Sequence, residues 1–170
     1  KTNDVDSFLA AVPIAHGTYL LSKAAIKKFR YKINLEPDLL VLKVDKDEQH
    51  CYIIELKDGD AFDTKKASGE KALMQAFENH ISKQIRFTTS IHFCCFNQED
   101  KAKIVSGFKN KISLEMAMTG TELCRILAIN HDDILGLRRK HQIENINFFI
   151  DELLKIDLIR SMIVKRLDNA

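Results

Sequence analysis

DLLVLKV at residues 38–44, DKDEQH at residues 45–50 and CYIIELK at residues 51–57 form the stretch of sequence that decides the fold. The first and last segments are rich in aliphatic and β-branched residues, and the segment between them is polar. Two apolar strands around a short polar connection are typical of a β-hairpin. Because side chains alternate along a strand, Glu55 and Lys57 lie on one face of this hairpin and Leu56 lies on the other.

The register of the hairpin decides which side chains face one another across it. If the turn is centred at the Lys46–Asp47 bond, the residue opposite Asp38 is Glu55. If the turn is centred one residue later, the residue opposite Asp38 is Lys57. Either register brings the three charged side chains to the same face of the sheet, and only a one-residue slip in the pairing separates them.

The rest of the sequence alternates between helical and strand-like patterns. Apolar residues at helical spacing predict helices, and apolar runs predict buried strands. The elements expected before Gly120 are helices over residues 18–29, from 64 or 67 to 86, and 101–110, with strands over 89–96 and 112–118. The elements expected after Gly120 are helices over residues 121–127, from 132 or 133 to 141, and 144–167. This order predicts an α/β fold, in which helices flank a mixed β-sheet and the C-terminal part is helical.

The length and composition suit an ordinary globular domain. The chain has 170 residues, of which 45% are hydrophobic and 29% are charged. We therefore expect one domain over residues 1–170, with a core at about 18–118 and a helical C-terminal part at about 121–168. The net charge of +2 neither requires nor excludes a nucleic-acid partner. Because the chain begins at Lys1 without an initiator methionine, we also expect that an N-terminal segment is missing.

The cysteines and the apolar C-terminal segment indicate the cellular setting. The four cysteines lack metal-ligand spacing, and three of them lie in strand-like runs, so we expect reduced core thiols in a cytoplasmic protein. The most apolar segment, residues 143–167, is interrupted by charged residues such as Asp151 and Lys155, which argues against a membrane span. We find no glycine-rich phosphate loop, so no nucleotide cofactor is expected.

Asp38, Glu55 and Lys57 are the candidate catalytic residues. Carboxylate oxygens at this spacing suit a hard cation such as Mg²⁺, which keeps water and accepts phosphate oxygens at its remaining positions. The cation would polarise a phosphate and lower the pKa of a water molecule, and Lys57 would position that water or stabilise the pentavalent charge. A salt bridge between Lys57 and one of the two acids, without chemistry, is the alternative that spacing alone leaves open.

The motif Pro37-Asp38…Glu55-Leu56-Lys57 resembles the signature of the PD-(D/E)XK nuclease superfamily, in its strand-turn-strand context and followed by a helix. The resemblance implies a restriction-endonuclease-like fold and metal-dependent hydrolysis of phosphodiester bonds. It implies that Asp38 and Glu55 bind the metal and that Lys57 acts on the attacking water. Many members carry another acid on the helix before the hairpin. That helix has none here, so Glu36 or the missing N-terminus would supply a fourth ligand.

Within this superfamily the chain is most similar to type II restriction endonucleases, through the segment 118-MTGTELCRIL-127 and the helical tail. This implies a prokaryotic cytoplasmic enzyme that cuts double-stranded DNA with Mg²⁺, for which Mn²⁺ can substitute. A repair, resolvase or exonuclease-type nuclease of the same fold is one alternative. A non-catalytic DNA-binding module is another. Because a duplex cut needs two hydrolyses on opposite strands, we expect a homodimer, with the apolar stripe of residues 144–167 as a candidate interface.

Several polar residues outside the motif are candidate DNA contacts. Lysines at the start of a helix oppose its dipole, so a passing phosphate backbone would explain them, although a solvated lysine face is an equal alternative. Gln75 occupies the helix on which exonuclease-like relatives place a glutamine, and an ordinary surface glutamine is the alternative. The basic run near residue 140 would contact DNA or stabilise a helix end. The candidates are Lys65, Lys66, Lys71, Gln75, Arg138 and Arg139.

Overall fold

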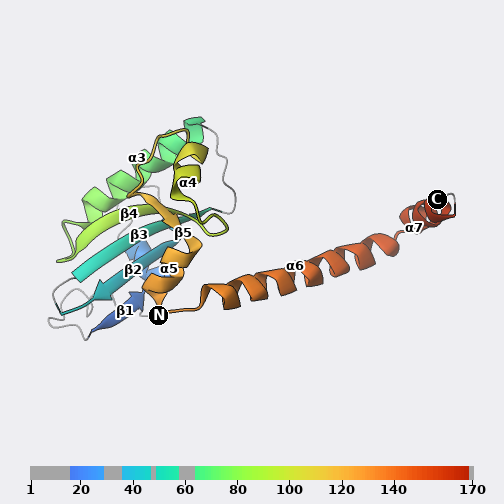
Figure 1. Ribbon diagram of the computed structural model, residues 1–170, viewed down its shortest axis with the longest axis horizontal. Coiled ribbons are helices and arrows are strands. Elements are labelled where there is room, and N and C mark those ends of the chain that lie inside the picture. The colour runs from blue at the N-terminus through green and yellow to red at the C-terminus, as the bar shows by residue number, and fades with distance from the viewer. Residues whose placement is uncertain (1–15, 29–35, 47–48, 58–63, 169–170) are drawn as a thin grey trace. The chain divides into compact units, whose positions relative to one another are not determined.

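A five-stranded mixed sheet organises the first part of the protein (Figure 1). The computed structural model describes residues 16–28, 36–46, 49–57 and 64–168. The strands lie in sequence order and are β1 (Gly17–Leu20), β2 (Leu39–Val44), β3 (Gln49–Lys57), β4 (Thr88–Cys95) and β5 (Ala117–Thr119). The pairs β1–β2 and β2–β3 are antiparallel, and the pairs β3–β4 and β4–β5 are parallel. The expected mixed sheet with flanking helices is confirmed.

The β2–β3 hairpin has the first of the two expected registers. Leu39 pairs with Ile54 and Leu42 pairs with Cys51. The next position outward from the Leu39 pair is therefore Asp38, opposite Glu55. This register places Glu55 and Lys57 on the same face as Ile53, and it places Leu56 on the opposite face.

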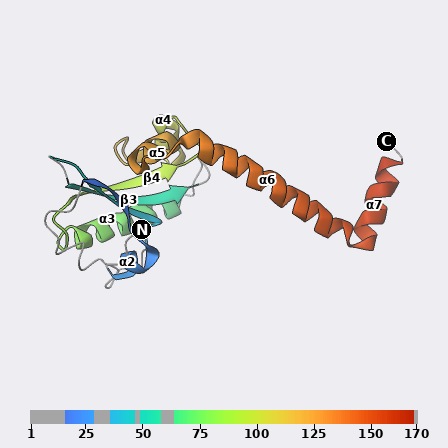
Figure 2. The same ribbon diagram turned by 90° about the horizontal axis from the view of Figure 1, so that it is seen from below.

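Each face of the sheet carries its own apolar cluster. The larger cluster joins strand residues such as Leu40, Ile53 and Phe93 to three helices, which are α2 (Lys23–Lys28), α3 (Thr64–Ile81) and α4 (Lys101–Gly107). The smaller cluster joins Ile54 and Cys94 to α5 (Gly120–Leu127). Figure 2 shows α2 and α3 on one side of the sheet and α5 on the other. The face that holds Glu55 and Lys57 is therefore the face that α3 covers.

All four cysteines have free thiols and are buried. Cys51, Cys94 and Cys95 lie in β3 and β4, and Cys124 lies in α5. The expected reduced core thiols are confirmed. In the described part of the chain no helix is both long enough and apolar enough to cross a lipid bilayer.

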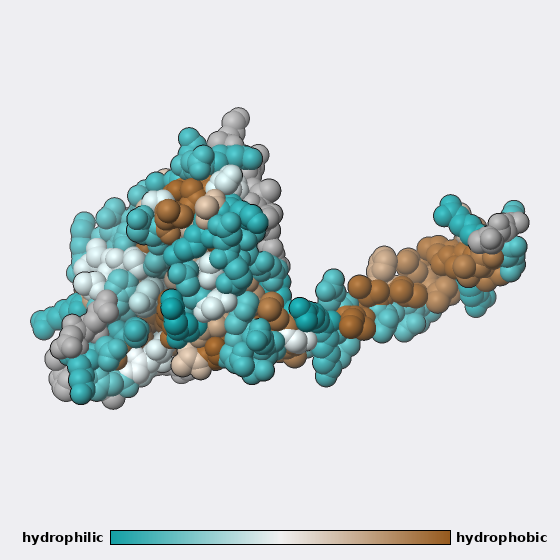
Figure 3. All heavy atoms as spheres, viewed as in Figure 1, coloured by the Kyte–Doolittle hydropathy of each residue, from teal (hydrophilic) through white to brown (hydrophobic). Residues whose placement is uncertain are grey.

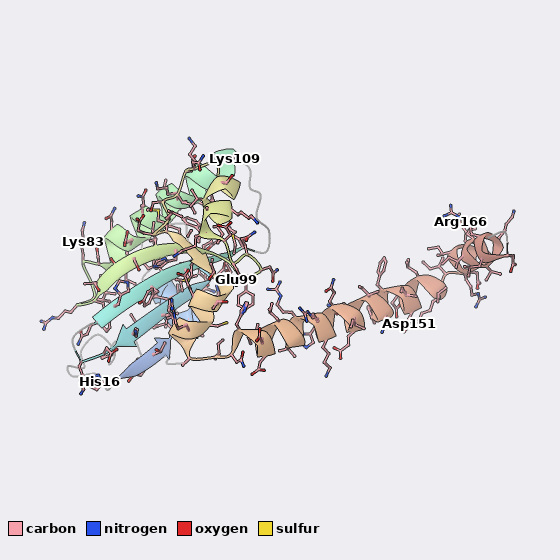
Figure 4. The ribbon with its side chains drawn as sticks, viewed as in Figure 1. His16, Lys83, Glu99, Lys109, Asp151 and Arg166 are labelled. Atoms are coloured by element: carbon pink, nitrogen blue, oxygen red, sulfur yellow. The ribbon has the colours of Figure 1, made fainter. Side chains whose placement is uncertain are left out.

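The chain divides into two compact units, Lys1–Ile129 and Asn130–Ala170. The second unit consists of α6 (His131–Leu154) and α7 (Asp157–Leu167), and none of the residues in these helices is buried. Figure 3 shows hydrophobic side chains gathered along this unit. The charged side chains labelled in Figure 4, Asp151 and Arg166, project outward from their helices.

The expected helix over residues 18–29 is wrong in its first part. Residues 17–20 form β1, which pairs with the edge of β2 through contacts such as Tyr19 with Leu42, and the described helical residues of this range are Lys23–Lys28. Apolar spacing over a few residues carries no information about an unpaired strand edge elsewhere in the fold. The expectation that Leu20 and Leu21 begin a helix therefore failed because of a tertiary interaction.

Other boundaries also differ from the expected ones. The helix α3 ends at Ile81 rather than at residue 86, and the expected strand over 112–118 is reduced to Ala117–Thr119. The two expected C-terminal helices are joined across residue 141 in one helix, α6, and the break falls instead at Ile156, whose backbone is extended. The helix α5 packs into the first unit, whose boundary lies after Ile129.

A capping box fixes the start of α5 and gives a test of the local structure. The Thr119 hydroxyl accepts a hydrogen bond from the Glu122 amide at 3.2 Å, and the Glu122 carboxylate accepts one from the Thr119 amide at 3.0 Å. We expect Thr119→Ala to lower the free energy of unfolding by about 1 kcal/mol, because an amide of the first turn loses its acceptor. Chemical denaturation measures this. The exposed Thr121→Ala serves as the control, and an equal loss in both variants would contradict the capping role.

Candidate active site

The three charged residues of the hairpin meet where β3 extends beyond β2. The ladder between these strands begins at Leu39 and Ile54, so the end of β3 is flanked by β4 on one side and by Asp38 on the other. Glu55 and Lys57 lie on the α3 face of the sheet, beyond the buried side chain of Ile53. The hairpin thus brings two acids and one lysine to one end of the sheet, as the sequence predicted.

Asp38 is held against the backbone of β3. One of its carboxylate oxygens accepts a hydrogen bond from the Leu56 amide at 2.9 Å. Its other oxygen lies 3.8 Å from the ammonium of Lys23, which also donates to the carbonyl of Pro37. The carboxylate extends the β2–β3 ladder by one bond beyond Leu39, so its position is coupled to the register of the hairpin.

Lys57 lies between two carboxylates from different elements. Its ammonium is 3.1 Å from an oxygen of Glu55 and 3.0 Å from an oxygen of Glu70, which belongs to α3. The exposed fractions of the three side chains are 16% for Lys57, 18% for Glu55 and 22% for Glu70. The group is largely withdrawn from water, so its charges interact more strongly than they would on an open surface.

The protonation of Glu55 and Lys57 follows from this burial. Burial raises the pKa of Glu55, the hydrogen bond and charge of Lys57 lower it, and the charges of Asp38 and Glu70 raise it again, with a net upward shift. Burial lowers the pKa of Lys57, but the hydrogen bonds to Glu70 and Glu55 outweigh it, and the net shift is again upward. Lys57 is therefore an ammonium ion at neutral pH, and the raised pKa of Glu55 reflects a negative charge that its surroundings do not fully compensate.

The second carboxylate oxygen of Glu55 is the point at which a compensating positive charge would bind. This oxygen is buried and has no hydrogen-bond partner among the described residues. A buried polar atom without a partner is costly unless a donor or a cation meets it. The described residues contain no cluster of three or more metal-ligating side chains. Two carboxylates, with water and phosphate at the other positions, nevertheless fit a hard divalent cation such as Mg²⁺.

Glu70 is the residue of this group that the sequence analysis missed. The buried side chains of α3 include Ala67, Met74 and Phe77, and Glu70 occupies the inward-facing position between the first two. A charged residue at a core-facing position of an amphipathic helix is a signal that could have found it. The expectation that Glu36 or an N-terminal segment supplies a fourth ligand stays a prediction, and residues 1–15 lie outside the described part.

The candidate DNA contacts lie in different surroundings. The side chains of Lys65 and Lys66, in the first turn of α3, fall outside the described residues. Lys71 donates to the carbonyl of Lys111 at 2.9 Å, which is a structural contact at the end of α4. Gln75 is exposed on α3.

Arg138 and Arg139 are exposed on α6, which continues to Leu154. The alternative that this basic run stabilises a helix end is therefore wrong, since the run lies inside a helix rather than in its last turn. A role for these two arginines in contacting DNA stays a prediction.

A mixed sheet that ends in two carboxylates and a half-buried lysine defines a candidate hydrolytic centre for phosphate esters. The chain is similar to the type II restriction enzyme HhaII of Haemophilus parahaemolyticus, with 42% identity over 156 residues. The similarity covers 89% of this chain and 68% of that relative. The chain therefore belongs to the type II restriction enzymes, which are site-specific deoxyribonucleases, and the expected endonuclease activity is confirmed. No protein-family model matches the chain, and no solved structure matches it.

Removing either acid should separate catalysis from stability. We expect Asp38→Asn and Glu55→Gln each to abolish DNA cleavage, because each removes one oxygen ligand of the cation. Folding raises the pKa of Glu55, so the stability it contributes below its pKa is lost as pH rises through that pKa. Glu55→Gln should therefore retain or raise the free energy of unfolding at neutral pH, and its stability should vary less with pH.

Gel assays of DNA cleavage and denaturation curves at several pH values measure these effects. The exposed acid Glu115 provides the control, since Glu115→Gln should leave cleavage unchanged. Cleavage at the wild-type rate by either site variant would remove that residue from the active site.

Proposed function

We propose that this restriction enzyme hydrolyses the phosphodiester bonds of double-stranded DNA at a Mg²⁺-dependent centre formed by Asp38, Glu55 and Lys57, in the manner of the PD-(D/E)XK nucleases. The observation that carries the proposal is the buried, unpaired oxygen of Glu55, which lies beside a second carboxylate and a charged lysine at one end of the sheet. The family membership of the chain supports DNA as the substrate.

Each side chain has a separate part in the proposed mechanism. The bound cation would polarise the scissile phosphate and favour ionisation of the attacking water. The Leu56 amide holds one oxygen of Asp38 and thereby fixes the orientation of the carboxylate that would bind the cation. Glu55 would offer the cation its unpaired oxygen while its other oxygen stays near Lys57.

Lys57 acts as a cation in this mechanism and not as a base. Its raised pKa keeps the ammonium protonated at the pH at which DNA is cut. An ammonium cannot accept a proton from the attacking water, but it can donate hydrogen bonds to that water and to the phosphate oxygens, which gain negative charge in the transition state. Lys57 therefore orients the water and stabilises the pentavalent phosphorus.

Restriction of DNA is favoured over the other nuclease functions expected from the fold. Exonuclease-like relatives carry a tyrosine four residues after the glutamine of α3, and this chain has Asn79 four residues after Gln75. The name of the relative, a type II restriction enzyme, points to cutting at specific sites.

Incubation of the chain with phage DNA and Mg²⁺ tests the function directly. Discrete bands on a gel are expected, whereas a smear would indicate unspecific nuclease activity and unchanged DNA would contradict the proposal. Lys57→Ala should lower the cleavage rate by at least about two orders of magnitude, the scale of one positioned catalytic group, with little loss of DNA affinity. The exposed Lys103→Ala is the control. A collapse of affinity with a preserved rate on bound DNA would make Lys57 a phosphate contact only.

We also propose that two chains form a symmetric dimer on DNA, since one chain carries one such centre and a double-strand cut needs two hydrolyses. The helices α6 and α7 support a dimer interface because they expose many large apolar side chains without burying any. Exposed patches of this kind mark interaction surfaces. The members of the expected stripe that are exposed are Ile146, Phe149, Ile150, Leu158, Met162 and Ile163. The alternative is that these helices cover the core of the same chain.

Sedimentation with a cognate duplex at micromolar concentration tests the dimer. We expect two chains per duplex, and we expect Phe149→Ser combined with Met162→Ser to reduce this to one chain because the substitutions break the stripe. Phe148→Ser is a matched control, because Phe148 is equally exposed but lies two residues from Ile146 and so on another side of the helix. One chain per site, with a nicked intermediate before each double-strand cut, would exclude the dimer.

A further inference from the structure

The position of Glu70 requires an explanation that packing does not give. It lies between the buried residues Ala67 and Met74 on the side of α3 that faces the sheet. A carboxylate at such a position loses much of its hydration, and an ion pair formed in that setting often adds no net stability compared with an apolar residue. The ion pair with Lys57 at 3.0 Å is therefore better explained by its effect on the position of Lys57 than by a contribution to the stability of the fold.

The metal ion changes which carboxylate can hold Lys57. Without the cation, the Lys57 ammonium is shared almost equally between Glu55 at 3.1 Å and Glu70 at 3.0 Å. A cation on Glu55 would draw the electron density of that carboxylate and repel the nearby ammonium. Glu70 belongs to another element and makes its contact with Lys57 independently of Glu55. It is the carboxylate that can retain the ammonium when Glu55 is engaged.

The charge balance of the site supports the same role. Asp38, Glu55 and Glu70 together carry three negative charges, which one ammonium and one divalent cation balance. With Glu55 bound to a metal ion, Glu70 would be the carboxylate left to Lys57, whose side chain is less than one-fifth exposed. The additional cation near Asp38, Lys23, is more than half exposed and is screened by water.

We propose that Glu70 is a positioning residue that holds the Lys57 ammonium at the reacting phosphate while Glu55 binds the metal ion. This inference rests on the function proposed above for Asp38, Glu55 and Lys57. In this role Glu70 would contact neither the phosphate nor the cation. Its effect on the cleavage rate should therefore pass entirely through Lys57.

A double-mutant cycle between Glu70 and Lys57 tests this dependence. The single-turnover rate of cleavage is measured at saturating enzyme for the wild type, Glu70→Gln, Lys57→Ala and the double variant. Glu70→Gln should lower the rate by about 10- to 100-fold, the range for loss of a residue that orients a ligand or catalytic group. In the Lys57→Ala background the same substitution should change the rate by less than about twofold, because the group that Glu70 positions is already gone.

Further measurements separate positioning from a structural or metal-binding role. Affinity for the cognate duplex without metal, affinity for Mn²⁺ by calorimetry, and the midpoint of thermal unfolding should be unchanged in Glu70→Gln. The matched control is Glu78→Gln, which makes the same change on the same helix at a half-buried acid whose partner is Thr89, away from the site. It should cleave at the wild-type rate.

Four outcomes would overturn the role of Glu70. They are a wild-type rate in Glu70→Gln, an independent multiplicative loss in the double variant, a tenfold weaker affinity for Mn²⁺, and a rate loss matched by a lower unfolding midpoint. None of them bears on the catalytic role proposed for Lys57, which fails instead if Lys57→Ala retains the wild-type rate. The two proposals are therefore distinguishable within one set of variants.

Discussion

The antiparallel pairing of β2 with β3 is the constraint on which the rest of the structure depends. Its register assigns Ile53, Glu55 and Lys57 to the face that Asp38 also occupies, and a shift by one residue would separate them from Asp38. The Asp38 carboxylate continues that pairing by accepting the Leu56 amide. The same interaction that builds the sheet thus sets the geometry of the acids, and a change that loosens the hairpin should disturb chemistry and stability together.

The crossover helix between β3 and β4 completes the site. Joining β3 to β4 in parallel requires a crossover, and α3 supplies it while packing on the face that carries the charged residues. Glu70 reaches Lys57 only because this crossover exists. Half-buried charged side chains lie at this end of the sheet, although apolar side chains would lose less hydration there. Such placements are typical of functional sites.

The sequence predicted the parts of this arrangement that rest on local patterns. The hairpin, its two possible registers, the buried strand β4 and the common face of Asp38, Glu55 and Lys57 all follow from alternation and apolar runs. The parts that rest on tertiary partners were missed. Residues 18–20 have helical spacing but pair with β2, and Glu70 is a single acid whose meaning depends on a lysine in another element. No described contact explains why the two expected C-terminal helices are joined in the one helix α6.

The burial of every cysteine also has a practical consequence. Burial raises the pKa of Cys94 to about 12 and shifts those of Cys51 and Cys124 in the same direction. Alkylating reagents attack the thiolate, so they should spare the folded protein and modify the chain only when it opens. The four native cysteines would therefore not react with a labelling reagent in the folded protein. A single cysteine introduced on the surface could carry a dye or a spin label by itself, and the rate at which the native thiols become reactive would time the opening of the sheet.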